Sequence, residues 1–283
     1  MNHEHDAGTD QVGTDVETPI ISVERVAFFG SVVPPERWGS TIQLNPENSR
    51  PLRTDSIPPL RDVRSYKLRS GRVTRAQEEA LRLHWDSFVL NPTAVLELAT
   101  IFQAGQKVIV EIGTGMGEAT AEMAEADPDL GILAIEVHRP GIGAHLGKIA
   151  DRQLKNVRII DGDAVTVFEE YLGPDSLDGI RVYFPDPWPK KRHHKRRLLQ
   201  SEWIELALTR LKNGGTLHIA TDWEPYADWI RQRGETNSNI SGGLVTRPEW
   251  RALTRFERQG LAEGHRSAFY PTSSLPTQPD RTL

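Results

Sequence analysis

The sequence predicts an α/β fold in which a mostly parallel sheet is covered by helices on both faces. From about residue 107 onwards, short apolar stretches alternate with stretches of helical length. Parallel strands need a crossover connection, usually a helix, so this alternation indicates repeated strand-helix-strand units. Length supports this prediction, because 283 residues can bury a full core for one large domain with attachments.

The expected elements follow one another without internal repeats. A first helix is expected over residues 75–88, where Thr74 and Gln77 are spaced as in a capping box. The expected strands cover residues 107–112, 131–137, 156–161, 177–184 and 215–220, with two closing strands at 243–246 and 265–270. The expected helices between them cover residues 118–127, 145–154, 163–171, 198–211 and 225–233.

The two ends of the chain differ in composition from its middle. Residues 1–62 are acidic and rich in proline, with a short strand expected at Val23 to Phe29. Such a segment buries too little apolar surface to offset the entropy of ordering, so a largely disordered extension is predicted. The folded domain is expected over residues 63–272, and a flexible tail over 273–283.

Composition excludes several classes of function. The chain has no cysteine, which excludes disulfide bonds, cysteine-ligated metals and thiol nucleophiles. No apolar stretch has the length of a membrane span, and the N-terminus lacks the features of a signal peptide. We therefore expect a cytoplasmic protein with no metal, no membrane association and no obligatory protein partner.

A proline-interrupted segment at the end of the fourth expected strand is the most informative part of the sequence. Pro185, Pro187 and Pro189 alternate with Asp186 and Trp188. Proline lacks an amide donor and fixes φ, so the segment is expected to be a rigid loop. Ligands bind at the carboxyl ends of strands in open α/β sheets, which makes Asp186 a candidate site residue. Trp188 could stack on a base or belong to the core.

A basic run follows this loop directly. It places six cations and two histidines in eight residues: Lys190, Lys191, Arg192, His193, His194, Lys195, Arg196 and Arg197. The net charge is −5, but charges beyond a Debye length of roughly 10 Å are largely screened. The local patch therefore decides what docks there, and it predicts a phosphate-rich partner rather than a merely solvated face.

A glycine-rich turn lies between the first expected strand of the alternating region and its helix. Glu111 precedes Gly113, Gly115 and Gly117, and this spacing differs from the dinucleotide fingerprint G-x-G-x-x-G. Glycines permit positive φ and close approach of a ligand, while an acid before the turn would repel a pyrophosphate. The pattern fits S-adenosylmethionine, whose amino and sulfonium groups are cationic; the alternative is a simple tight turn.

Two further acids end the next two strands. Glu136 could accept hydrogen bonds from ribose hydroxyls, or it could be a surface residue. Asp163 could bind an adenine amino group, or it could cap the following helix. After the fifth strand, Asp222 or Glu224 could read the donor edge of guanine, or Asp222 could cap the next helix. Acids at the ends of three consecutive strands favour adenosylmethionine binding more strongly together than each does separately.

Four stretches of the chain resemble bacterial tRNA (guanine-N7)-methyltransferases. They are Glu111 to Gly117, Phe184 to Arg197, Thr221 to Glu224 with Tyr226, and Thr254 to Glu257, and residues 70–77 look like that family's N-terminal basic segment. The proline loop that runs into the basic run is highly specific, whereas the glycine turn is shared by many methyltransferases. The likeness covers residues 63–270 and leaves out the N-terminal 60 residues.

The resemblance implies a Rossmann-like class I methyltransferase domain with a mostly parallel, seven-stranded sheet. It implies transfer of the methyl group of S-adenosyl-L-methionine to guanine N7 in tRNA, forming 7-methylguanosine at position 46 of the variable loop. Guanine N7 has a lone pair and no proton, so the reaction needs in-line placement and a nearby anion rather than a strong base. Asp186 could supply that charge or accept hydrogen bonds from guanine N1 and N2.

The resemblance also assigns roles to individual residues, with Asp186 as the catalytic residue. Donor binding would involve Glu111, Gly113, Gly115, Gly117, Glu136, Asp163, Ala164 and Asp186. Substrate contacts would come from Lys190, Asp222, Thr254, Arg255, Phe256 and Glu257. The tRNA would be bound by Lys191, Arg192, His193, His194, Lys195, Arg196 and Arg197.

Three other functions compete with this one. A methyltransferase acting on another RNA or on a small molecule would share the donor site, although the basic run disfavours a small substrate. A non-catalytic RNA-binding module would keep the fold without the reaction. A dinucleotide-dependent dehydrogenase is disfavoured by the glycine spacing.

Overall fold

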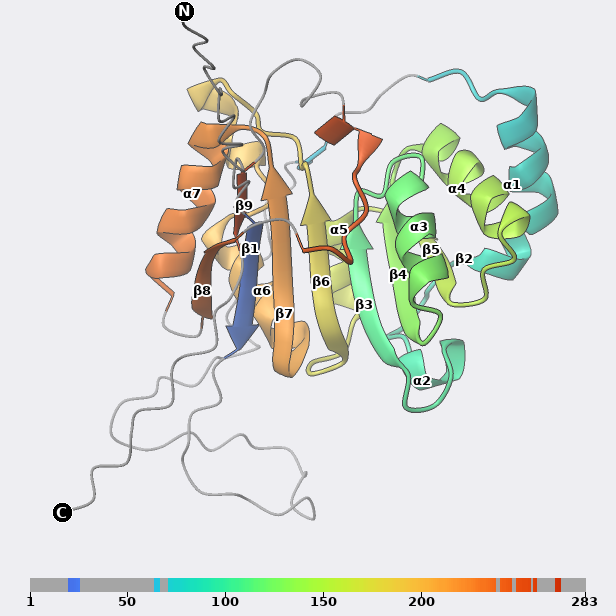
Figure 1. The fold of residues 1–283 in the computed structure, drawn as a ribbon, viewed down its shortest axis with the longest axis horizontal. Coiled ribbons are helices and arrows are strands. Elements are labelled where there is room, and N and C mark those ends of the chain that lie inside the picture. The colour runs from blue at the N-terminus through green and yellow to red at the C-terminus, as the bar shows by residue number, and fades with distance from the viewer. Residues whose placement is uncertain are drawn as a thin grey trace, which may run out of the picture.

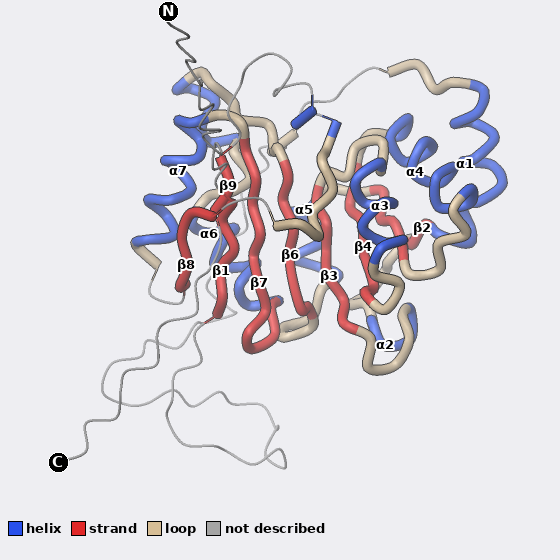
Figure 2. The backbone as a smooth tube through the Cα atoms, viewed as in Figure 1, coloured by secondary structure: helices blue, strands red, loops and turns tan. Residues whose placement is uncertain are grey.

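In the part of the chain that the structure describes, nine strands form one central sheet (Figures 1 and 2). The computed structural model describes residues 20–25, 64–66, 71–237, 240–245, 248–255, 257–258 and 268–270. Within these residues the strands are β1 (Ile20–Arg25), β2 (Val89–Leu90), β3 (Lys107–Ile112), β4 (Leu130–Glu136), β5 (Val157–Asp161), β6 (Leu177–Tyr183), β7 (Leu211–Thr221), β8 (Ile240–Val245) and β9 (Ala268–Tyr270).

The sheet has a parallel part and an antiparallel edge. Its order is β2-β5-β4-β3-β6-β7-β1-β8, and β9 pairs with β7. The six strands from β2 to β7 are parallel to one another, whereas β1, β8 and β9 pair antiparallel with their neighbours. The expected count of seven strands is thus too low by two, in part because a two-residue strand such as β2 is too short for any periodic pattern.

The N-terminal strand precedes the predicted domain boundary at residue 63. β1 pairs with β7 and β8, so it is part of the sheet. The strand expected at Val23 to Phe29 overlaps β1 at residues 23–25, while residues 26–29 lie outside the described part of the chain. A shortened chain that starts near Val63 would lose this strand, and the domain boundaries themselves stay a prediction.

Helices cover both faces of the sheet, as expected for parallel strands (Figure 1). They are α1 (Arg75–Phe88), α2 (Leu98–Ile101), α3 (Glu118–Ala126), α4 (Arg139–Asp151), α5 (Ala164–Thr166), α6 (Ser201–Arg210) and α7 (Glu224–Glu235), with a π-helical turn at Val167–Tyr171 and a 3₁₀ helix at Lys191–Arg196. The capping box of α1 is present, because Gln77 N donates to Thr74 Oγ1 at 3.3 Å and Thr74 N donates to Gln77 Oε1 at 2.8 Å.

Two apolar clusters separate the helices into layers. Ile132 and Ala134 of β4 pack with α1, α3 and α4 on one face, where Leu146 of α4 is fully buried. Leu133 and Ile135 pack on the other face with α6 and α7. Successive residues of a strand point to opposite faces, so β4 needs apolar residues at almost every position. This explains its continuous apolar sequence.

The parallel strands bring their carboxyl ends to one edge of the sheet. β4 and β5 end in register, with Glu136 opposite Asp161, and β6 and β7 pair up to Tyr183 and Ala220. The turns that leave β3, β4, β5 and β6 therefore meet at this edge. No helix in the described part of the chain is long and apolar enough to cross a membrane.

Candidate active site

A pocket opens where these turns meet. Its walls come from the glycine turn after β3, the end of β4 with His138, the turn after β5, the end of β6 with the loop to Asp186, and the distant residues Ser65 and Tyr66. Gly113, Gly115, Glu136, Ala164 and Asp186 were expected in a donor site, and all five line this pocket. The elements are separated in sequence and are brought together by the parallel topology.

The glycine turn has the backbone conformation that its residues permit. Gly113, Gly115 and Gly117 have φ of +73°, +60° and +73°, which side-chain-bearing residues rarely adopt. A Cβ at Gly113 or Gly115 would have no neighbour within 4 Å, so the turn leaves open space there. Gly117 has another role, because a Cβ there would lie 2.3 Å from the His145 ring of α4. It permits α3 and α4 to pack and does not line the pocket.

Glu136 holds the pocket wall together. Its Oε2 accepts a hydrogen bond from Gly115 N at 2.6 Å, and its Oε1 accepts from Val137 N at 2.8 Å and His138 N at 2.9 Å. The side chain is buried but still lines the pocket. One carboxylate thus fixes two turns and presents negative charge to the cavity.

Asp163 caps α5, which was the structural alternative for this residue. Its Oδ1 accepts from Val165 N at 2.9 Å. Its neighbours Gly162 and Ala164 line the pocket, whereas Asp163 does not. The cap fixes the turn after β5 against the cavity.

The Asp186 loop leaves β6 in a strained conformation. Phe184 and Trp188 have φ of +51° and +45°, and each stands directly before a proline. Left-handed conformations of such residues cost about 1–3 kcal/mol each and persist only where the surroundings impose them. Phe184 N donates to Ala220 O at 2.8 Å, which ties the start of the loop to β7. Asp186 lies between the two strained residues and lines the pocket.

Trp188 is a buried anchor of this loop rather than an exposed stacking residue. It is 6% exposed, and its Nε1 donates to Ser65 O at 2.9 Å. The guanidinium of Arg196 lies 4.1 Å from its ring, and Arg196 Nε donates to Arg64 O at 3.2 Å. The loop, the basic run and residues 64–66 therefore form one packed unit beside the pocket.

The basic run forms a turn of 3₁₀ helix at Lys191–Arg196, so the loop expected there is confined to the proline segment before it. Lys190, Lys191, Arg192 and Lys195 are exposed. His193 and His194 are half-buried and pack edge-on against Trp188 and Trp229. Partial burial, with the neighbouring cations, lowers the pKa of His193 below its usual value.

Arg197 corrects the prediction that every cation of the run binds RNA. It is 2% exposed, and its Nε donates to Pro187 O at 2.9 Å. Its guanidinium lies 4.7 Å from the Tyr226 ring and 4.8 Å from the Trp229 ring. A buried, stacked guanidinium holds the proline loop against α7 and is not placed to contact a phosphate.

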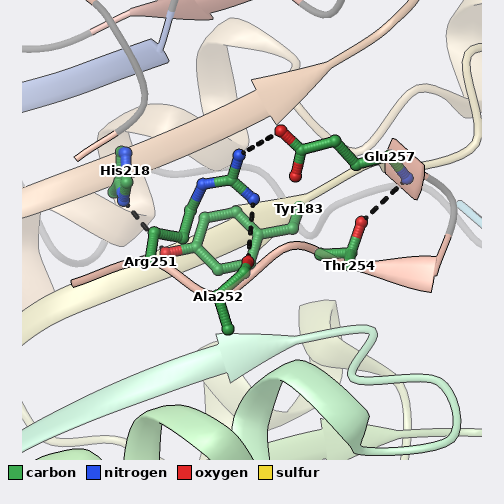
Figure 3. A network of polar contacts seen from close by, with 6 residues as sticks. All are labelled: Tyr183, His218, Arg251, Ala252, Thr254 and Glu257. Atoms are coloured by element: carbon green, nitrogen blue, oxygen red, sulfur yellow. Dashed lines mark hydrogen bonds and ion pairs between the residues drawn. The ribbon is translucent and has the colours of Figure 1, made fainter. Parts of the chain in front are cut away.

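Two residues expected on the substrate side, Thr254 and Glu257, belong to a polar network with Arg251 (Figure 3). Asp222 follows β7 and is half-buried, and Thr254 and Arg255 are described, whereas Phe256 lies outside the described residues. Glu257 is 2% exposed and pairs with buried Arg251, with Arg251 Nη2 to Glu257 Oε1 at 2.8 Å. Sequence reasoning missed Arg251, because an isolated arginine carries no periodic signal.

A buried Tyr-His pair lies beside this ion pair. Tyr183 Oη and His218 Nδ1 are 3.0 Å apart. Burial, with the positive charges of Arg251 and Arg181, holds the pKa of His218 well below its usual value, so the imidazole is neutral at pH 7. Burial likewise raises the pKa of Tyr183 above its usual value. Neutral partners can share one hydrogen bond without adding charge to the cluster.

Known proteins match most of the chain. A family model described as a putative methyltransferase matches residues 105–269. The tRNA (guanine-N(7)-)-methyltransferase of Streptomyces avermitilis is 50% identical over 211 residues, which cover 72% of this chain and 73% of that protein. The protein of the same description from Nitrosospira multiformis is 47% identical and covers 73% of this chain and 92% of its own. The chain belongs to this methyltransferase family.

Two other matches do not support a family assignment. An rRNA methylase structure from Streptococcus thermophilus covers 50% of this chain and 75% of its own, at 19% identity and a TM-score of 0.36. A family model described as a mycothiol-dependent nitroreductase matches only residues 1–43. The family assignment therefore depends on the sequence relatives and on the family model that matches residues 105–269.

Glu111, the acid before the glycine turn of this methyltransferase, lies apart from the pocket lining. It is 3% exposed and neighbours Arg181 across the β3–β6 pair. Burial raises its pKa from 4.5 to about 7, and Arg181 opposes part of that shift. Folding therefore favours the protonated carboxyl near neutral pH. Its contact with a donor stays a prediction.

This shift predicts how stability depends on pH. A carboxyl whose pKa is raised by folding lowers the stability of the folded state when it is ionised. The full cost applies above about pH 7, and it decreases as the pH falls towards 4.5, the pKa in the unfolded chain. Glu111→Gln should therefore raise the free energy of unfolding at pH 8, on the order of 2–3 kcal/mol, and change it little at pH 5. Denaturant unfolding at both pH values checks this. Glu79→Gln, on the exposed side of α1, is the control. An equal gain at both pH values would contradict the prediction.

Proposed function

We propose that this protein transfers the methyl group of S-adenosyl-L-methionine to N7 of guanine in tRNA, at position 46 of the variable loop. The proposal for this member of the family depends on one main observation. Asp186 lies on a strained loop that lines the pocket at one end and continues into an exposed basic turn at the other. An acid at a small-molecule pocket beside phosphate-binding cations fits methyl transfer to a nucleic acid.

The pocket residues fit the donor. The open space at Gly113 and Gly115 would accept the methionine part against the backbone of the glycine turn. Glu136 presents negative charge in the cavity beside this turn. Gly162 and Ala164 leave room for a flat ring after β5. When bound, S-adenosylmethionine supplies an electrophilic methyl group on a cationic sulfur, and the acidic lining suits that charge.

The chemistry asks little of the protein beyond placement and charge. Guanine N7 attacks with its in-plane lone pair, so no residue has to remove a proton. The carboxylate of Asp186 stabilises the positive charge that develops on the purine, in a site partly shielded from water. The loop holds this carboxylate in place before the substrate arrives, which lowers the cost of alignment.

The RNA is bound by the exposed cations of the basic turn. Four cations that follow the Asp186 loop are exposed: Lys190, Lys191, Arg192 and Lys195. Phosphate contacts position a nucleic acid without reading its sequence, so the choice of position 46 depends on tRNA shape and on the acceptor side of the site. Asp222, Thr254 and Arg255 are the proposed acceptor contacts. The site of action would be the cytoplasm, where tRNA is modified.

The reaction predicts a specific product. Purified protein incubated with labelled S-adenosylmethionine and unmodified tRNA should place label in 7-methylguanosine, and the label should map to position 46. A tRNA with adenosine at position 46 is the matched control and should receive none. Label in another nucleoside would refute the substrate assignment. No transfer despite binding of S-adenosylhomocysteine would favour the RNA-binding module.

Asp186 should matter for turnover more than for binding. Asp186→Asn keeps a hydrogen-bond acceptor and removes the charge, so both it and Asp186→Ala should lower kcat by about 10²–10³-fold. The tRNA Kd should change little, as measured by fluorescence anisotropy. Asp129→Asn, in the exposed turn before β4, is the control. Full activity in the asparagine variant would show that charge is not the role of Asp186.

The exposed lysines should set affinity and its salt dependence. Each lost phosphate contact reduces the slope of log K against log salt by about 0.7–0.9, so Lys191→Ala with Lys195→Ala should flatten it by about 1.5. The matched control is Lys107→Ala with Lys155→Ala, two exposed lysines at the opposite edge of the sheet. Equal slopes in both double variants would contradict binding at the basic turn.

A further inference from the structure

The C-terminal segment carries a buried ion pair that the reaction does not explain. Arg251 and Glu257 are six residues apart, their side chains are 0% and 2% exposed, and their charged groups are 2.8 Å apart. Burying two charges is costly, and an apolar pair of similar volume is often at least as stable. Packing alone therefore does not explain a buried ion pair in the segment that contains Thr254 and Arg255.

Both ends of the proposed acceptor motif are tied to this pair. Glu257 N donates to Thr254 Oγ1 at 3.1 Å, and the Glu257 carboxylate is held by Arg251 (Figure 3). Glu257 therefore links Thr254 to Arg251, because its backbone amide binds Thr254 and its side chain binds Arg251.

Arg251 in turn is seated on the strand that leads to Asp186. Its guanidinium lies 5.2 Å from the ring of Tyr183, the last residue of β6 and three residues before Asp186. Ala252 packs into the small apolar cluster that Tyr183 forms with Ala119, Met123 and Ala220. The same arginine therefore contacts the base of the Asp186 loop and the acceptor motif.

The neighbouring residue gives the segment a second attachment. The Trp250 ring lies 5.1 Å from the His218 ring, and the Arg181 guanidinium lies 4.5 Å from Trp250. His218 is hydrogen-bonded to Tyr183, so Trp250 and Arg251 meet the same two strands, β6 and β7. Trp250 fixes the segment on the sheet, and Arg251 fixes the turn that follows.

We propose that Arg251 is a positioning residue for the methyl acceptor, which holds Thr254 and Arg255 in register with Asp186 through its ion pair with Glu257. The proposal rests on the proposed function. It gives Glu257, which the resemblance places among the substrate contacts, a structural role through Arg251. The pair sets the geometry of the acceptor side, while the pocket for the donor lies among other residues.

Removal of the charges without loss of packing tests this role. Arg251→Met combined with Glu257→Leu replaces the pair by apolar side chains and should leave Tm near that of the wild type. The single-turnover rate with saturating tRNA should still fall about 100-fold, the cost of a misplacement of about 1 Å. The Kd for S-adenosylhomocysteine should stay unchanged, and Arg251→Lys should recover part of the rate.

Two further measurements separate positioning from stability and from the proposed function. Arg152→Met with Glu125→Leu removes an ion pair of 2.7 Å between α3 and the end of α4, and should leave the rate unchanged. Hydrogen exchange of the backbone amide at position 257, which donates to Thr254 in the wild type, should be faster in the Arg251/Glu257 double variant. A double variant with wild-type rate and wild-type exchange would overturn the proposal. Absence of 7-methylguanosine with the wild type would instead overturn the proposed function, and the exchange rate would still decide the placement.

Discussion

Three backbone hydrogen bonds to one buried carboxylate fix the wall on which the site is built. Glu136 ends β4 and accepts from the amides of Gly115, Val137 and His138. These donors belong to the turns after β3 and β4, which are separate in sequence and both line the pocket. An amide side chain has a single acceptor oxygen and could not hold both turns in the same way. The position of the glycine turn thus depends on the carboxylate of Glu136 at the end of the neighbouring strand β4.

The pleat of the sheet divides the work between two faces. Ile112 and Val182 line the pocket, while Glu111 and Arg181, one residue earlier on β3 and β6, point to the other face. That second face carries the ionisable cluster that includes Tyr183, His218 and Arg251. Tyr183 also lines the pocket, so the end of β6 joins the pocket wall to the segment that contains Arg251. A shift in the register of either strand would disturb both.

Periodicity predicted the alternating part of the fold well, because each strand of a parallel sheet is apolar on both faces. β3 has the predicted bounds, and α1 begins directly after its predicted cap. Five residues expected in the donor site line the pocket, since strand ends are readable from sequence and the topology brings them together.

The misses have a different physical origin. A run of cations indicates an exposed surface, but Arg197 is buried because Tyr226 and Trp229, about 30 residues away, form a stacking site for it. Arg251 and His218 gave no signal for the same reason, since their partners are distant in sequence. The sequence allowed two roles for Trp188, and the hydrogen bond from its indole to Ser65 O identifies it as a packing residue. Long-range pairing decides such residues, and composition does not report it.

The two left-handed residues of the proline loop have a consequence for the entropy of binding. Phe184 and Trp188 are each followed by a proline, which has few alternative conformations. A chain limited in this way loses little freedom when a ligand arrives, so ordering the loop adds little to the free-energy cost of forming the ternary complex. The strain was overcome when the domain folded, through the packing of Trp188 and the tie of Phe184 to β7. Folding stability and preorganisation are therefore coupled in this loop, and a substitution that relaxed the backbone could stabilise the protein while making the bound complex less favourable.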